Sequence, residues 1–132
     1  MHANSLIAVI TKNRTNPAYV GARFGAKRVL ATHKIPSVQL VPGNPDDIAE
    51  QSELVRRAIE LSPDAIVLAP AHTTKMKNVL EEVGAADIPL FCIVSEPDPS
   101  SAVTFVGSND RILARNMATR LAEHLGQLGH IV

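Results

Sequence analysis

Short apolar runs alternate with helix-forming segments along this chain, and this alternation limits the possible folds more than any other feature. The runs cover residues 5–11, 37–41, 64–70, 88–94 and 102–107. Short, nearly continuous apolar runs rich in β-branched residues are typical of buried parallel strands. The order therefore predicts an α/β fold, a parallel sheet with helices on both faces in three α/β/α layers.

Helix-start signals follow the predicted strands. The predicted capping residues are Asn16, Asn44, Thr73 or Thr74, and Ser108 or Asn109. Proline follows Asn16 and Asn44, and a proline after the cap suits the first turn of a helix. Apolar residues at helical spacing predict the buried faces. These faces comprise Tyr19, Ala22, Ala26 and Val29; Ile48, Val55 and Ile59; Met76, Val79, Leu80 and Val83; and Leu113, Met117, Leu121 and Leu125.

Composition narrows the class of protein further. The 132 residues are 45% hydrophobic, enough for one core. With 13 basic and 13 acidic residues the chain lacks the positive charge of a nucleic-acid binder, so no direct nucleic-acid partner is expected. The single cysteine, Cys92, excludes an internal disulfide, and its apolar strand predicts an inert core residue. No apolar run approaches the roughly 20 residues of a membrane span.

Motifs for catalysis, cofactors and metals are absent from the sequence. Neither G-x-G-x-x-G nor G-x-x-x-x-G-K-[ST] occurs, and there is no G-x-S-x-G nucleophile elbow. The acidic residues of a response-regulator receiver are replaced by Thr11-Lys12 and Ala69-Pro70. The five histidines form no i, i+4 pair. We therefore expect no enzyme activity, no cofactor and no metal site.

Polar residues follow the predicted strands. In open parallel sheets, ligands bind outside the carboxyl ends of the strands. Those ends correspond here to residues 12–16, the turn after Val41, and residues 71–74, 95–98 and 108–110. A binding site is expected in these loops.

Several segments resemble a known family in order and spacing. They are "LIAVITKNRTNPAYVGARFGAKRVL", "PDAIVLAP", "IPLFCIV" and "VTFVGSNDRILARNMATRLAEHLG". They resemble the N-terminal part of periplasmic sugar-binding proteins of the ribose, allose and galactose type, which have two flavodoxin-like lobes around a cleft. The resemblance implies that residues 1–106 are an incomplete first lobe. Residues 107–132 would then be the first helix and the strand start "HIV" of the second lobe.

The resemblance also implies binding roles for six residues. The candidates are Lys12, Asn16, Tyr19, His72, Glu96 and Asn109. Asn16 matches the asparagine before proline, whose amide can donate to and accept from ligand hydroxyls. Tyr19 matches an aromatic position that stacks on a sugar, or else it packs in the core. Lys12 matches a lysine that some members use on ligand.

The other candidates lie on later loops. The family's Asp-Arg pair is replaced by Val94 and Ser95, so Glu96 is expected to supply the carboxylate. His72 follows the third strand and is either a cleft residue or a surface residue. Asn109 lies in the segment that crosses between lobes, where capping of the helix is the simpler role.

The resemblance implies the solute-binding component of an ABC uptake transporter, which binds a sugar or polyol and docks on membrane subunits. The expected location is the periplasm, with no signal peptide in "MHANS". The effector domain of a lac-repressor-type regulator is the alternative, and a small flavodoxin-like enzyme is a weaker one. A lone first lobe would expose apolar surface, so we expect a homodimer and weak ligand affinity.

Overall fold

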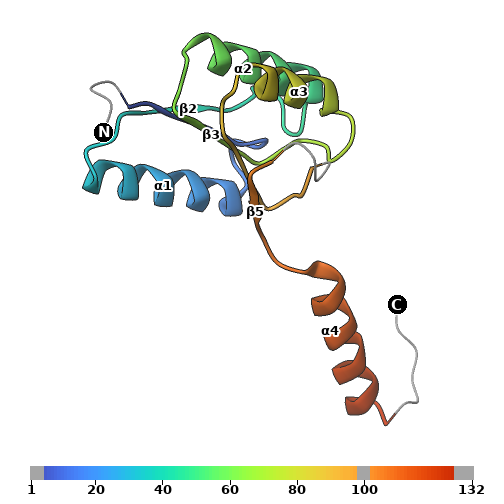
Figure 1. The fold of residues 1–132 in the computed structure, drawn as a ribbon. Coiled ribbons are helices and arrows are strands. Elements are labelled where there is room, and N and C mark those ends of the chain that lie inside the picture. The colour runs from blue at the N-terminus through green and yellow to red at the C-terminus, as the bar shows by residue number, and fades with distance from the viewer. Residues whose placement is uncertain (1–4, 98–101, 127–132) are drawn as a thin grey trace.

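The computed structural model describes residues 5–97 and 102–126, and it confirms the predicted α/β fold (Figure 1). The strands are β1 (Ile7–Ile10), β2 (Ser37–Leu40), β3 (Ala65–Leu68), β4 (Leu90–Ile93) and β5 (Thr104–Val106). The helices are α1 (Pro17–Thr32), α2 (Ile48–Glu60), α3 (Lys77–Ala85) and α4 (Asp110–His124). The predicted strand start at 130–132 and Asp98 lie outside the described residues.

The five strands form one parallel sheet in the order β2-β1-β3-β4-β5. Strand β1 pairs with β2 on one side and β3 on the other, so that Ile7 lies between Ser37 and Ala65. Figure 1 shows α1 on one face of the sheet and α2 with α3 on the other. Because every pairing is parallel, the carboxyl ends of the strands meet at one edge.

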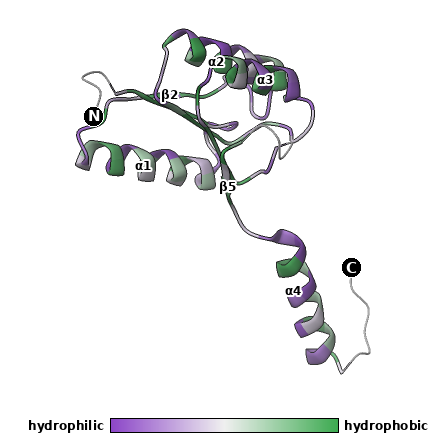
Figure 2. Cartoon of the chain, viewed as in Figure 1, coloured by the Kyte–Doolittle hydropathy of each residue, from purple (hydrophilic) through white to green (hydrophobic). Residues whose placement is uncertain are grey.

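The core lies between the sheet and the pair α2 and α3. Alternate strand residues face these helices, as the period of a strand requires. The sheet contributes Ala8, Ile10, Ile66, Leu68, Leu90 and Cys92, and the helical side contributes Val55, Ala58, Met76, Val79, Leu80 and Val83. Figure 2 shows strands that are mainly hydrophobic and helices in which hydrophobic and hydrophilic residues alternate. Burial of these side chains provides the main driving force for this lobe.

Two of the predicted helix faces are less buried than expected. Tyr19 is the buried residue of α1, whereas Val29 is 54% exposed, so its predicted burial was wrong. The predicted stripe of α4 is also exposed, from Leu125 at 38% to Met117 at 74%. Figure 1 shows α4 leading away from the sheet after β5. Within the described residues, α4 therefore has no sheet to pack against.

Two of the predicted helix caps were also wrong. Asp47, not Asn44, caps α2 by accepting a hydrogen bond from the N–H of Glu50. The chain still turns at Asp46, which has a φ of 58° and donates its N–H to the carbonyl of Lys12. This contact between two loops delays the start of the helix.

Helix α3 begins without a side-chain cap. The residue at its N-cap position is Met76, and Thr73 and Thr74 lie in the turn before it. The predicted caps of the other two helices are confirmed. Asn16 caps α1 and Asn109 caps α4, each with its Oδ1 atom. None of the helices in the described part of the chain is both long and apolar enough to span a membrane.

The thiol of Cys92 is fully buried, and desolvation raises its pKa to about 12. A thiol pKa raised above its unfolded value stabilises the fold below about pH 9, and this stabilisation is lost as the pH rises toward 12. We expect the free energy of unfolding to fall more steeply between pH 9 and 12 in the wild type than in Cys92→Ala. Urea denaturation across that range measures both slopes, and parallel slopes would contradict the prediction.

Candidate functional site

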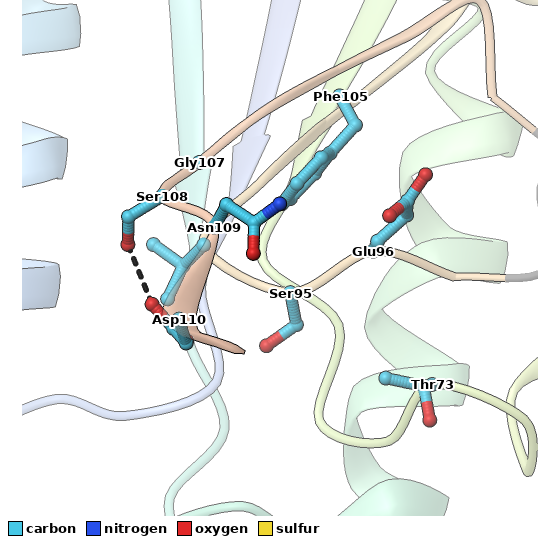
Figure 3. A pocket seen from close by; sticks show the side chains of 9 residues that line it. Thr73, Ser95, Glu96, Phe105, Gly107, Ser108, Asn109 and Asp110 are labelled. Atoms are coloured by element: carbon cyan, nitrogen blue, oxygen red, sulfur yellow. Dashed lines mark hydrogen bonds between the residues drawn. The ribbon is translucent and has the colours of Figure 1, made fainter. Parts of the chain in front are cut away.

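A pocket of about 640 Å³ opens at the carboxyl edge of β4 and β5 (Figure 3). The loop after β3 supplies Thr73, and the end of β4 supplies residues 94–96. The end of β5 and the start of α4 supply Phe105 and residues 107–110. The pocket therefore occupies the edge of the sheet at which the sequence predicted ligand binding.

The pocket lining is rich in acceptors for hydroxyl groups. Glu96 and Asp110 contribute carboxylates, and no described lysine, arginine or histidine lines the pocket. Ser108 donates its hydroxyl to Asp110 at 2.7 Å. The Oδ1 atom of Asn109 accepts the N–H of Ile112 at 3.1 Å, so the cap leaves the Nδ2 amide to other partners. Such a lining suits a ligand with several hydroxyl donors.

A strained turn carries the β4 side of the pocket. Val94 has a φ of 68°, a left-handed conformation that costs a β-branched residue about 1–3 kcal/mol. Hydrogen bonds hold it on both sides, from the N–H of Val94 to the carbonyl of Val106 and from the N–H of Ser95 to the carbonyl of Ile93. The turn places Ser95 and Glu96 at the pocket instead of letting β4 continue.

Lys12 follows β1 and contacts two other residues. Its Nζ atom lies 3.2 Å from the carboxylate of Asp46 and 5.7 Å from the centroid of the Tyr19 ring. Partial burial lowers the pKa of Lys12, but the hydrogen bond to Asp46 and the electrostatic effects of Tyr19 and Asp46 outweigh it. The net pKa is raised, so this ammonium stays charged at neutral pH. Lys12 and Tyr19, both predicted from the sequence, are thus brought together.

Asn16 and Tyr19 have structural roles in addition to any contact with ligand. Asn16 is exposed and caps α1 through a 3.0 Å bond from the N–H of Ala18. Tyr19 is 7% exposed, which is the burial of a core residue.

Arg23 is a residue that sequence reasoning missed. From α1 it donates to the hydroxyl of Thr11 at 2.7 Å and to the carbonyls of Asn13 and Arg14 at 2.8 Å each. Asn13 in turn accepts the N–H of Asn16 at 2.8 Å. These bonds fix the loop between Lys12 and Asn16. An arginine in the second turn of α1 gives no such signal in the sequence, because its partners are mostly main-chain atoms.

His72 and its surroundings stabilise the turn before α3. Its Nδ1 atom accepts the N–H groups of Thr74 and Lys75, each at 3.2 Å. The buried Gln51 donates to the carbonyl of Ala69 at 2.9 Å and accepts the N–H of Ala71 at 2.6 Å. These contacts place Thr73, rather than His72, in the lining of the pocket.

The six predicted candidates thus fall into separate groups. Lys12, Asn16 and Tyr19 belong to the loop and helix after β1, and Glu96 and Asn109 line the same pocket. Phe105, which also lines that pocket, was not predicted, and Ser95 was predicted only as part of the loop at residues 95–98. Among the described residues, no cluster of three or more histidines, cysteines or acidic residues could hold a metal ion.

The fold and site define a class, a parallel α/β lobe whose pocket and polar loops lie at the carboxyl edge of its sheet. The chain belongs to the family described as periplasmic binding protein domain, whose model matches residues 7–132. This confirms the resemblance seen in the sequence. The family is described as a binding domain, which agrees with the expectation of a protein that is not an enzyme.

Similar proteins agree with this assignment. A D-apiose import binding protein from Actinobacillus succinogenes is 31% identical over 130 residues, covering 98% of this chain and 41% of that protein. An ABC transporter periplasmic solute binding protein from the same species, with bound D-allose, superposes with a TM-score of 0.82 at 22% identity. The alignment covers 95% of this chain and 46% of that structure.

A third structure has a different description. It is an ABC transporter, LacI family transcriptional regulator from Brachyspira murdochii, with a TM-score of 0.85 at 22% identity. The alignment covers 96% of this chain and 41% of that structure. The chain thus spans less than half the length of these relatives.

Proposed function

We propose that the chain is part of the solute-binding component of an ABC uptake transporter and binds a sugar, polyol or similar hydroxylated solute. The observation that carries this proposal is the pocket at the carboxyl edge of β4 and β5, lined by Glu96, Asn109 and other hydroxyl-binding groups. Small polar ligands are held specifically by such groups, because a missing hydroxyl leaves a buried partner unpaired.

The remaining parts of the proposal follow from this function. Residues 1–106 form the first lobe, and residues from 107 onward begin a second lobe that closes over the solute. The absence of buried residues in α4 supports this division.

The protein works in the periplasm and delivers solute to membrane subunits, which detect the closed arrangement of the lobes. Lys12 and Asn16 contribute contacts from the first loop, with the Tyr19 ring beneath the ammonium. His72 contributes from the turn next to Thr73.

The experiment that tests the function is a titration with D-apiose, D-allose, D-ribose and small polyols, followed by NMR because weak affinity is expected. Binding of at least one neutral sugar in the millimolar range supports the proposal. No shift with any of them up to 50-fold excess (~50 mM) would contradict it, because a Kd of a few millimolar would fill about nine-tenths of the sites at that concentration.

The second candidate is the effector domain of a lac-repressor-type regulator, and it is favoured by the similarity to the Brachyspira structure described as a regulator. Both functions use the same lobe and ligand class. The codons upstream of Met1 distinguish them, because a signal peptide supports transport and a helix-turn-helix of about 60 residues supports regulation.

We also propose that this chain forms a homodimer. Large apolar side chains of α4 and β5 are exposed, including Leu113 at 52%, Met117 at 74% and Val106 at 65%. A second copy would cover them, because exposed apolar side chains favour association. Light scattering at micromolar concentration should give the mass of a dimer, and Met117→Lys should lower that mass to a monomer. A monomeric wild type would overturn this part of the proposal.

A further inference from the structure

Aromatic side chains are scarce in this protein, and Phe105 is the one that lines the pocket. The sequence has three phenylalanines, one tyrosine and no tryptophan. Tyr19 is buried and Phe24 is 69% exposed on α1, and neither lines the pocket. Phe91 lies in β4 and is also absent from the lining. Phe105 is therefore the aromatic ring available to a ligand at this site.

Gly107 leaves room for that ring. A Cβ atom at residue 107 would lie 2.3 Å from the tip of the Phe105 ring, which is closer than two non-bonded carbon atoms can approach. The ring thus lies against the bare main chain of Gly107 at the mouth of the pocket. Figure 3 shows Phe105 extending from β5 on the side of the pocket where Asn109 begins α4. The inner part of the same side chain packs against the core, which limits its movement.

The groups around the ring define the kind of ligand that could lie on it. Ser95, Glu96 and Asn109 surround an apolar surface with hydrogen-bonding atoms. A sugar ring has matching chemistry, with C–H groups on its faces and hydroxyls at its edge. The carboxylates of Glu96 and Asp110 would repel an anionic ligand, because no described cationic side chain lines the pocket and the ammonium of Lys12 is already paired with Asp46.

We propose that Phe105 is the platform on which the ring of a neutral sugar lies, with its hydroxyls bonded to Glu96 and Asn109. This inference rests on the proposed function and adds to it a specificity-determining residue and the charge of the substrate. Pyranoses and furanoses bind by this geometry. Sugar acids and sugar phosphates are excluded, and linear polyols bind more weakly because they lack a flat face.

The test uses the 132-residue chain with ¹³C-labelled phenylalanine, titrated with D-allose, D-ribose, D-gluconate and D-ribose 5-phosphate. A neutral sugar is expected to shift the ring signals of one phenylalanine, which Phe105→Leu removes. That variant keeps apolar bulk and should weaken sugar binding about threefold to tenfold. Phe24→Leu is the matched control, because it makes the same substitution on an exposed ring outside the pocket, and it should leave affinity unchanged.

The outcomes separate the two proposals. Sugar binding with unmoved Phe105 signals, or equal affinities of Phe105→Leu and Phe24→Leu, would overturn the platform and leave the proposed function intact. Binding of the anionic ligands as tightly as the neutral ones would overturn the stated charge preference. Failure of every sugar to bind the wild type would remove the proposed function and this inference together. Circular dichroism of both variants confirms that they are folded.

Discussion

Replacing Gln51 with methionine should lower the free energy of unfolding by about 2–5 kcal/mol. Gln51 is fully buried, and its amide bonds both the carbonyl of Ala69 and the N–H of Ala71. Methionine fills a similar volume, so the cost comes from two main-chain groups left without partners. Urea denaturation measures the loss, and the midpoint of thermal unfolding should fall by roughly 10 °C.

Two further variants make this prediction specific. Gln39→Met removes a comparable 2.9 Å bond to a main-chain carbonyl at an exposed position, and it should change stability by less than about 0.5 kcal/mol. Gln51→Glu loses the amide donor at neutral pH but regains a donor when its carboxyl is protonated. Its stability relative to the wild type should therefore recover as the pH falls. Equal losses in Gln51→Met and Gln39→Met would refute the assigned role.

Replacing Arg23 with methionine is expected to destabilise the chain by about 2–4 kcal/mol. The guanidinium donates to Thr11, Asn13 and Arg14, and the hydroxyl of Thr11 is fully buried. Hydrogen bonds from a charged group are stronger than neutral ones. Arg23→Lys should recover only part of the loss, because a single ammonium cannot span three acceptors in the way a planar guanidinium does.

The effect of Arg23→Met should be concentrated in the loop after β1. Hydrogen exchange is expected to quicken at the amides of residues 13–16 while the core of β3 remains protected. Sugar affinity should fall about tenfold if Lys12 and Asn16 contact the solute. Arg57→Met, an exposed arginine in the last turn of α2, is the matched control and should be close to neutral. Uniform acceleration across the whole chain would argue against a local role.

The sequence predicted the fold well because the signals for it are local. Each strand was marked by its own apolar run, and Asn16 and Asn109 were identified as caps from their neighbours. Asn44 was wrong because Asp46 contacts Lys12 from another loop, a contact that local sequence does not reveal. The exposure of Met117 was missed for a related reason. Helical spacing shows which face is apolar but not which element covers it.

The candidate site was predicted only in part. Glu96 and Asn109 followed strand ends in the sequence, and both line the pocket. Phe105 and the strained Val94 were missed because they depend on the register between β4 and β5. That register sets Ile93 opposite Val106 and so decides where β4 stops. Pairing between strands that are separated in the chain is not encoded in the alternation of apolar residues.

The pairing of Lys12 with the Tyr19 ring also has a spectroscopic consequence. Because the chain has one tyrosine and no tryptophan, its near-ultraviolet emission comes from Tyr19. The ammonium of Lys12 lies 5.7 Å from the ring centroid, at the start of the loop that leads from β1 to α1. Any event that moves this lysine changes the surroundings of the chromophore. The protein thus carries an intrinsic optical probe of that loop, readable without a label.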